Sequence, residues 1–250
     1  MRGSPRIYAH RLGAAYGLDS SAAALERVLA GPVDGLETDV CLCADGGLVL
    51  LHDPLLPIGT TLRGWANERS SAEIAAARLR DRNGAVTDES PLLLDALLSR
   101  APPGLTLQLE VKAHADAGLA RQTALAICAL CREHRDRVEV ISFHSAACKA
   151  AAAEGFRSRL VIFADYEPEA LAAWAVAHGV SGISVEHFLL TERLARPMRL
   201  AGLSVSTGTV NEPELLERIL PRSPDSICTD RPHELAAWTQ SLRDEPPIAA

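Results

Sequence analysis

The sequence predicts an α/β protein, a (β/α)8 TIM barrel with a small helical insertion after the third strand. Short apolar, β-branched segments alternate with Ala-, Leu-, Glu- and Arg-rich segments of helical period, which is typical of βα units repeated around a parallel sheet. The length of 250 residues suits one such barrel. Because no Gly-, Ser- or Pro-rich linker divides the chain, we expect residues 1–250 to form a single domain.

Nine short apolar runs, most of them ending at a turn or a polar residue, are predicted to be strands. They are Ile7–His10, Leu36–Cys41, Leu48–His52, Leu105–Val111, Val138–Phe143, Leu160–Ala164, Gly182–Val185, Leu203–Thr207 and Ser226–Thr229. Helices are predicted at Ser20–Ala30, Ser71–Arg80, Leu92–Ser99, Ala115–Glu133, Ala146–Glu154, Pro168–Ala177, Thr191–Ala201, Pro213–Leu220 and His233–Gln240. Pro168, Pro213 and Pro232 stand where helices begin, a position that tolerates proline.

Nine strands are one too many for an eight-stranded barrel, and the second and third strands account for the excess. The turn between them is too short for a parallel crossover, so they should form an antiparallel hairpin. If Gly46-Gly47 is a two-residue turn, Cys41 faces His52 and Asp39 lies diagonal to His52. One of the two strands is then expected outside the barrel, and the segment 55–101 forms the insertion.

Composition and charge argue against several classes of protein. The net charge of −7 disfavours nucleic acid or an anionic membrane surface as the main partner. The N-terminal residues lack the apolar core of a signal peptide, and no apolar run is long enough to span a bilayer. We therefore expect a cytoplasmic protein with no stable membrane insertion, and the oligomeric state stays open.

Six cysteines in such a chain are expected to be reduced thiols rather than a disulfide framework. Cys128 and Cys131 lie in a predicted helix, and no second Cys/His pair with zinc-ligand spacing follows them. Packing in the core is therefore favoured over a metal site for this pair.

Polar side chains gather at the carboxyl ends of the predicted strands in the first half of the chain. In a barrel these strand ends meet at one face, where the loops build the site. Glu37-x-Asp39 and Glu110-x-Lys112 have the spacing that points both members of a pair to one side of a strand. Each motif alone has a plainer interpretation, such as a solvated strand exit. Their shared position favours a site made of His10, Arg11, Glu37, Asp39, His52, Asp53, Glu110 and Lys112.

Three carboxylates that converge on one point repel one another and raise one another's pKa unless a cation lies between them. Glu37, Asp39 and Glu110 are therefore predicted to bind a divalent metal ion. Ca²⁺ accepts carboxylates in flexible geometry and Mg²⁺ keeps more of its water, so the choice between these two ions stays open.

The remaining polar residues suit a substrate that carries a phosphate. Arg11 and Lys112 would add fixed positive charge beside the metal ion, and arginine can bind a phosphate through two hydrogen bonds. His10 and His52 would serve as proton donor and acceptor, because the usual imidazole pKa lies near neutrality. This combination predicts cleavage of a phosphodiester.

At these residues the chain resembles the glycerophosphodiester phosphodiesterase family, whose barrel belongs with the phosphatidylinositol-specific phospholipase C-like phosphodiesterases. The order and spacing of the matching motifs make the resemblance specific, and they span nearly the whole chain. The motifs are I-Y-A-H-R at 7–11, D-G-L-E-T-D-V at 34–40, D-G-G-L-V-L-L-H-D at 45–53, L-Q-L-E-V-K at 107–112, I-S-F at 141–143, T-V-N-E-P at 209–213 and T-D-R-P at 229–232.

The resemblance implies hydrolysis of small-molecule glycerophosphodiesters to glycerol 3-phosphate and an alcohol. By family analogy a glycerol hydroxyl attacks the phosphorus and expels the alcohol, and water then opens the cyclic phosphate. The insertion is expected to cap the pocket. The residues that match the family's site are the acid/base pair His10 and His52, the metal ligands Glu37, Asp39 and Glu110, and the phosphate contacts Arg11 and Lys112.

The chain departs from the family pattern in the substrate pocket. Leu12 stands where H-R is usually followed by glycine, and Asp19-Ser20-Ser21 stands where E-N-T is usual. Gly208 precedes T-V-N where an aromatic residue is common, and His144 follows I-S-F where aspartate is frequent. We expect intact catalytic machinery, an altered pocket, and a polar rim position for His144.

Two alternatives remain at this stage. A phospholipase D-like enzyme acting on lysophospholipid or sphingomyelin would have a similar active site. It would also need an apolar surface for the acyl chain, and the apolar residues of the insertion that could contribute to one are Ile58, Leu62 and Trp65. A non-catalytic phosphate-ester binding protein would have kept the fold and lost turnover.

Overall fold

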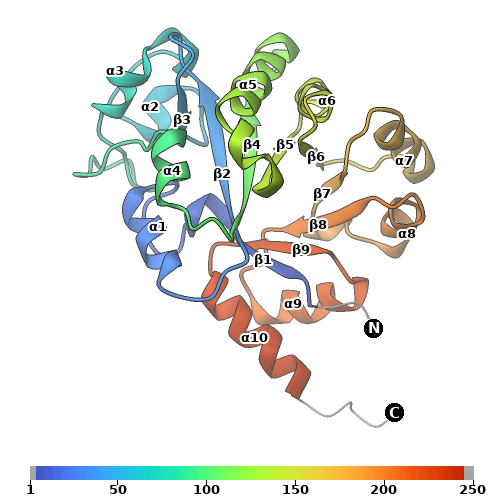
Figure 1. The fold of residues 1–250 in the computed structure, drawn as a ribbon. Helices are drawn as coiled ribbons and strands as arrows, with labels where there is room; N and C mark the ends of the chain where they lie inside the picture. The colour runs from blue at the N-terminus through green and yellow to red at the C-terminus, as the bar shows by residue number, and fades with distance from the viewer. Residues whose placement is uncertain (1–3, 245–250) are drawn as a thin grey trace.

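In a computed structural model, which describes residues 4–244, the strands close into a barrel (Figure 1). Within these residues eight parallel strands pair in the order β1, β2, β4, β5, β6, β7, β8 and β9, and β9 pairs with β1. The predicted (β/α)8 barrel is confirmed. The strands are β1 Arg6–Ala9, β2 Gly35–Leu42, β3 Leu48–Leu50, β4 Thr106–Lys112, β5 Val138–Ser142, β6 Arg157–Ile162, β7 Gly182–Glu186, β8 Ser204–Gly208 and β9 Ser226–Thr229.

Helices surround the barrel (Figure 1), and capping residues in the sequence mark the starts of some of them. Side-chain oxygens of Ser21, Ser70, Asp116 and Thr191 accept backbone N–H groups at the starts of four helices. The α-helices are α1 Ala22–Leu29, α2 Leu56–Gly59, α3 Ser71–Ala75, α4 Leu94–Arg100, α5 Ala117–Leu130, α6 Ser145–Ala153, α7 Pro168–Ala177, α8 Glu192–Leu200, α9 Pro213–Ile219 and α10 Pro232–Asp244. The 3-10 turns are η1 His10–Leu12, η2 Ala66–Glu68, η3 Arg132–Arg137, η4 His187–Leu189 and η5 Leu220–Arg222.

The strand in excess is β3, which pairs antiparallel with β2 and lies outside the barrel. The register predicted for this hairpin is wrong, because Cys41 pairs with Val49 and not with His52. The backbone N–H of Cys43 donates a hydrogen bond to the oxygen of Gly47 and closes a three-residue loop, whose last residue, Gly46, has a φ of +84°. A left-handed glycine at that position is common in three-residue hairpin loops. As a result His52 lies beyond the end of β3.

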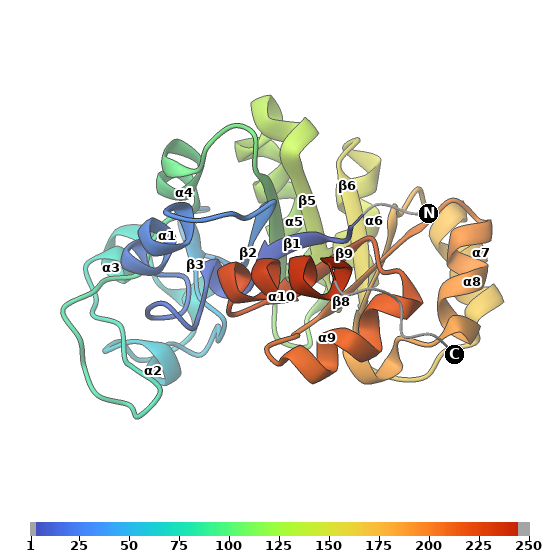
Figure 2. The ribbon, with the colours of Figure 1, turned by 90° about the horizontal axis from the view of Figure 1, so that it is seen from below.

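The insertion between β3 and β4 is only partly helical, and Figure 2 shows α2 and α3 on one side of the barrel beside α1. The helix predicted at Ser71–Arg80 ends at Ala75. Leu79 instead forms an antiparallel bridge with Thr60, and Arg80 forms one with Val86. These backbone pairs replace the hydrogen bonds that further helical turns would have supplied.

The apolar core lies between the strands and the surrounding helices, with a separate small cluster under the insertion. Leu107 and Leu109 on β4 are fully buried. All six cysteines are free thiols, and Cys128 and Cys131 are buried in the core. The prediction that this pair packs in the core therefore agrees with the structure.

A buried ion pair lies among the strands of the barrel. Arg159 Nε on β6 lies 2.8 Å from Glu139 Oε1 on β5, and the amide of Gln108 on β4 donates a 2.7 Å hydrogen bond to Glu139 Oε2. Burial raises the pKa of Glu139, but the charge of Arg159 and the hydrogen bond from Gln108 outweigh it and hold that pKa below its usual value. The pair therefore stabilises the charged form of Glu139.

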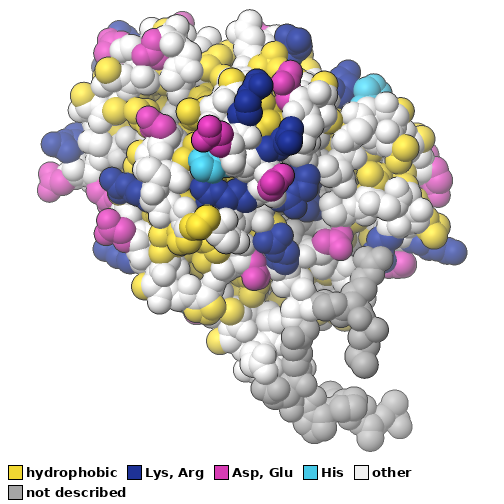
Figure 3. All heavy atoms as spheres, in the orientation of Figure 1, with side chains coloured by type: hydrophobic (Ala, Val, Ile, Leu, Met, Phe, Trp, Pro, Cys, Tyr) yellow, Lys and Arg dark blue, Asp and Glu magenta, His cyan; other side chains and the backbone are white. Residues whose placement is uncertain are grey.

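Acidic and basic side chains are interspersed on the face of the molecule that Figure 3 shows. Among residues 4–244, none of the helices combines the length and the apolar character that crossing a bilayer requires. The cytoplasmic location and the single-domain assignment stay predictions.

Candidate active site

The carboxyl end of β1 leads into the site through a left-handed turn. Arg11, Leu12 and Gly13 have φ values of +49°, +59° and +89°. Positive φ costs a residue other than glycine roughly 1–2 kcal/mol, so Leu12 is strained where the family usually has glycine. Its side chain is fully buried in the core, and this burial offsets the strain. The turn also aims the backbone N–H of Arg11 at Glu37 Oε2, 3.0 Å away.

The three predicted acidic residues converge. Glu37 and Asp39 are on β2, and Glu110 lies on β4 directly opposite Asp39 in the parallel register. Their ligand oxygens all lie within 4.8 Å of one another. Glu37 and Asp39 are 3% and 2% exposed, so bulk water cannot screen their charges.

Lys112 lies against this acidic cluster. Its Nζ is 2.9 Å from Asp39 Oδ1 and 2.5 Å from Glu110 Oε1. Burial, and then the charge of Asp39, raise the pKa of Glu37 to about 6 and that of Glu110 to about 7. Burial also raises the pKa of Asp39, but the charges of Lys112, His52 and Arg11 hold it below its usual value. Glu37 and Glu110 therefore keep their protons to a higher pH than ordinary carboxyl groups do, and a cation placed between them would favour their charged forms.

The donor set fits a divalent metal ion. Asp39 Oδ2 is buried and has no hydrogen-bond partner among the described residues, and the closest cationic nitrogen paired with it, Arg11 Nε, is 3.5 Å away. A buried carboxylate oxygen without a partner is costly. Oxygen ligands from Glu37, Asp39 and Glu110 are the type that Ca²⁺ and Mg²⁺ prefer, so the residues can hold either ion.

His10 is held by residues from the opposite end of the chain. Its Nδ1 lies 2.7 Å from Asp230 Oδ1, and Asp230 Oδ2 accepts a 2.7 Å hydrogen bond from the amide of Asn211. The amide oxygen of Asn211 in turn accepts from the backbone N–H of Asp230. Burial is the largest influence and lowers the pKa of His10, but the hydrogen bond with Asp230 and the charge of Glu37 outweigh it and raise that pKa. His10 Nε2 faces Glu37 Oε2 at 4.0 Å.

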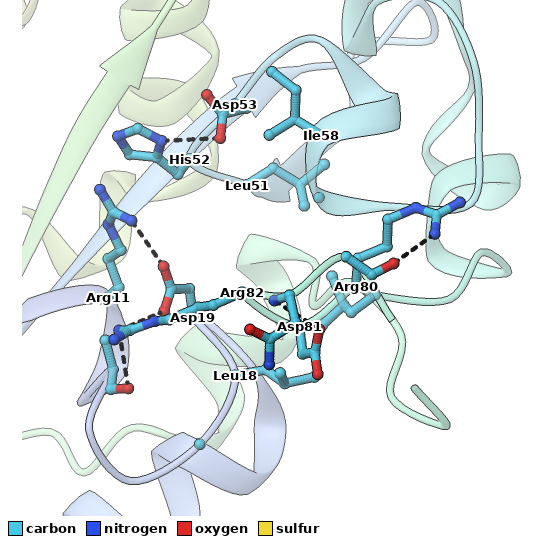
Figure 4. Close-up of a pocket in the computed structure, with 16 residues that line it drawn as sticks. Arg11, Leu18, Asp19, Leu51, His52, Asp53, Ile58, Arg80, Asp81 and Arg82 are labelled. Carbon is cyan, nitrogen blue, oxygen red and sulfur yellow. Dashed lines mark hydrogen bonds and ion pairs between the residues drawn. The ribbon is translucent and has the colours of Figure 1, made fainter. Parts of the chain in front are cut away.

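His52 has a weaker anchor. Its Nδ1 lies 3.2 Å from Asp53 Oδ2, and both side chains are 38% exposed. In Figure 4 the guanidinium group of Arg11 lies between the imidazole of His52 and Asp19. Arg11 forms a 2.7 Å ion pair with Asp19, which also lies 3.5 Å from Arg82 of the insertion. Asp19-Ser20-Ser21 stands where the family usually has E-N-T, and Asp19 still supplies a carboxylate that pairs with Arg11.

The two histidines line different cavities. The larger cavity, about 730 Å³, lies between the loop before α1 and the insertion, and Arg11, His52 and Arg82 are among its lining residues (Figure 4). The smaller cavity, about 100 Å³, opens among the strand ends and is lined by His10 and Glu110. Of the seven predicted residues, Arg11 and His52 line the larger cavity, and His10, Glu37 and Glu110 line the smaller one.

Sequence reasoning left two residues of this network without a role. Asn211 and Asp230 lie in the T-V-N-E-P and T-D-R-P motifs, just beyond the ends of β8 and β9. The same strand-end rule that found Glu37 and Glu110 could have found them. His144 hydrogen-bonds the backbone oxygen of His114 and lines neither of these two cavities, and its place on the rim of the pocket stays a prediction.

The chain is similar to known proteins over nearly its whole length. A model of the glycerophosphoryl diester phosphodiesterase family matches residues 2–234. A glycerophosphodiester phosphodiesterase of Bacillus altitudinis is 30% identical over 149 residues, which cover 56% of this chain and 58% of that protein.

Solved structures share the fold at low sequence identity. An Oleispira antarctica phosphodiesterase, in complex with the product sn-glycerol-3-phosphate, superposes with a TM-score of 0.80 at 21% identity, covering 94% of this chain and 97% of that one. A glycerophosphodiester phosphodiesterase from Parabacteroides distasonis gives a TM-score of 0.80 at 22% identity, covering 98% and 100% of the two chains.

Proposed function

The chain belongs to the glycerophosphoryl diester phosphodiesterase family, and from this membership we propose how its site hydrolyses glycerophosphodiesters. The predicted enzyme class, a phosphoric diester hydrolase, is confirmed at the level of the family. The proposed reaction releases glycerol 3-phosphate and an alcohol, depends on a divalent metal ion, and uses His10 and His52 for proton transfer.

The observation that carries the proposal is the convergence of Glu37, Asp39 and Glu110 within 4.8 Å on two neighbouring strands, β2 and β4. A divalent ion held there would stabilise negative charge on the phosphoryl oxygens of the substrate. Arg11 and Lys112 border the same carboxylates, so we assign them as contacts of the substrate phosphate.

We assign proton transfer to the two histidines, since His10 lines the smaller cavity and His52 lines the larger one. Asp230 occupies Nδ1 of His10, so Nε2 is the atom that exchanges a proton with the substrate. His52 lines the cavity beside the insertion. One imidazole takes the proton of the attacking hydroxyl and the other gives a proton to the departing alcohol. The glycerol 3-phosphate in the Oleispira antarctica relative supports the product that we propose.

Product analysis tests this function. Purified protein with Ca²⁺ or Mg²⁺ should convert glycerophosphocholine to equal amounts of glycerol 3-phosphate and choline. Each of the variants His10→Ala and His52→Ala should lower kcat by about 10²- to 10⁴-fold. His144→Ala serves as a control, since that histidine lines neither cavity. Choline without glycerol 3-phosphate would favour a phospholipase D-like enzyme, and no turnover of any phosphodiester would favour a binding protein.

A further inference from the structure

Three serines form a row across the wall of the smaller cavity. Ser184, Ser206 and Ser226 lie opposite one another on β7, β8 and β9 in the parallel register, and all three line this cavity. We call them the serine row. The hydroxyls of Ser184 and Ser206 are hydrogen-bonded at 2.6 Å, whereas the buried hydroxyl oxygen of Ser226 has no hydrogen-bond partner among residues 4–244. A buried hydroxyl without a partner is costly, so Ser226 is open to a hydrogen bond with a bound molecule.

Glu186 adds a carboxylate to the same cavity. It follows Ser184 by two positions on β7, so the two side chains share a face of the strand, and both line the cavity. Glu186 is half-buried, and within the described part of the chain its carboxylate forms no hydrogen bond or ion pair. An ionised carboxylate only accepts hydrogen bonds. Glu186 can therefore accept a hydrogen bond from a hydroxyl group that enters this cavity.

Gly208 leaves the wall opposite Glu186 without a side chain. The two residues are partners in the register of β7 and β8, and Gly208 also lines the cavity. A Cβ atom on Gly208 would come within 2.8 Å of the Cβ atom of Cys228, so the aromatic residue that is common in the family before T-V-N does not fit against this wall. The cavity thus presents a carboxylate and hydroxyls where an aromatic ring would make it apolar.

The rest of the lining suits the carbon chain of glycerol. Phe143, Val161 and Val185 supply apolar surface, and His10 and Glu110 of the proposed active site line the same cavity. Its volume is about 100 Å³, compared with about 730 Å³ for the larger cavity. The smaller cavity therefore suits the three-carbon glycerol unit, and the larger one suits the head group.

We propose that Glu186 and the serine row bind the terminal hydroxyl of the glycerol unit and make the site specific for substrates in which that hydroxyl is present and free. The inference rests on the proposed function, whose reaction it leaves unchanged. The terminal hydroxyl donates a hydrogen bond to Glu186 and accepts one from Ser226. A site built to hydrogen-bond a substrate hydroxyl discriminates against an analogue without it, because the polar groups of the site then stay unpaired.

The test compares glycerophosphocholine with the corresponding phosphocholine ester of propane-1,2-diol, which keeps the hydroxyl that attacks phosphorus and lacks only the terminal one. Wild-type protein with Ca²⁺ or Mg²⁺ should prefer glycerophosphocholine by about tenfold to a hundredfold in kcat/KM. In Glu186→Ala and in Ser226→Ala this preference should fall about tenfold, while kcat/KM for the analogue stays near its wild-type value. Glu186→Gln should keep part of the preference, because its amide oxygen still accepts a hydrogen bond.

Glu169→Ala is the matched control, because Glu169 is exposed on α7 and lines neither cavity, and its preference should equal that of the wild type. Turnover of glycerophosphocholine with no preference over the analogue, or with an unchanged preference in Glu186→Ala or Ser226→Ala, would overturn the inference and leave the proposed function standing. Turnover of neither substrate by wild-type protein would remove the proposed function and this inference together.

Discussion

The two histidines of the site differ in how firmly their side chains are held. His10 is fixed by Asp230, which is itself fixed by Asn211, so that its tautomer and orientation are determined by the ends of β8 and β9. His52 has an exposed partner, Asp53, and lies beyond the end of the short strand β3. A carboxylate behind an imidazole sets which ring nitrogen carries the proton. We therefore expect Asp230 to act as a positioning residue for His10.

Asp230→Asn should lower kcat for glycerophosphocholine by about tenfold to a hundredfold with little change in KM, because the substrate still binds while His10 loses its anchor. Steady-state kinetics measure this split. Asp230→Glu, which keeps the carboxylate, should recover part of the loss. Asp225→Asn provides a structural control, since Asp225 accepts a backbone hydrogen bond from Val205 at the opposite end of β8. Equal losses in Asp225→Asn and Asp230→Asn would mean that Asp230 acts only through stability.

The sequence predicted the acidic cluster but not the role of Asp230, because only the former depends on a local pattern. Glu37, Asp39 and Glu110 were predictable because a period of two along a strand fixes which side chains share a face. The role of Asp230 depends on β9 closing the barrel beside β1, which no local pattern encodes. The sequence also did not predict the backbone strain at Leu12, because its φ of +59° follows from the turn that places His10 and Arg11.

Among the elements, neighbouring strands of the barrel are joined by a buried ion pair as well as by backbone hydrogen bonds. Glu139 on β5 and Arg159 on β6 are 1% and 6% exposed and form an ion pair in the barrel. The pair fixes neighbouring strands that carry Phe143 and Phe163 at their ends. Removing one partner leaves the other charge buried and unpaired, which is costly.

Glu139→Gln should reduce the free energy of unfolding by about 3 kcal/mol at neutral pH. The pKa of Glu139 is lowered in the folded state from its usual value of 4.5, so its stabilising contribution is complete above that value and is lost as the pH falls through the folded-state pKa. The difference between wild type and variant should therefore shrink below about pH 4.

Urea denaturation at several pH values measures this difference. Glu192→Gln is the control, because Glu192 pairs with Arg199 on the surface with 64% of its side chain exposed, and its loss should stay within about 0.5 kcal/mol. A difference between wild type and Glu139→Gln that stays constant from pH 7 to pH 3 would show that charge is not the cause.

The sequence predicted the strands of the barrel more accurately than the hairpin register and the helix bounds in the insertion. Alternating strands and helices placed β1, β2 and β4 to β9 close to their observed bounds, because buried strands are short apolar runs. The β2–β3 register was missed, because the loop contains three residues and the glycine pair suggested two. The helix at Ser71–Arg80 was overextended, because bridges to Thr60 and Val86 compete with helical hydrogen bonds.

At the scale of the whole molecule, barrel closure brings residues from four parts of the chain to one face. Glu37 and Glu110 of the acidic cluster line the cavity among the strand ends, and Arg11, which pairs with Asp39, lines the cavity bounded by the insertion. Fold and family were accessible from the sequence, because βα alternation and ordered motifs span the chain. The division into two cavities was not, since it depends on how the insertion folds back over the loop before α1.

Chelation tests the central claim, that Glu37, Asp39 and Glu110 act together through a divalent ion. Release of glycerol 3-phosphate from glycerophosphocholine should stop after EDTA treatment and return when Ca²⁺ or Mg²⁺ is added back. It should not return in Glu110→Gln, which removes one ligand charge. Undiminished release by the metal-free enzyme would contradict the account.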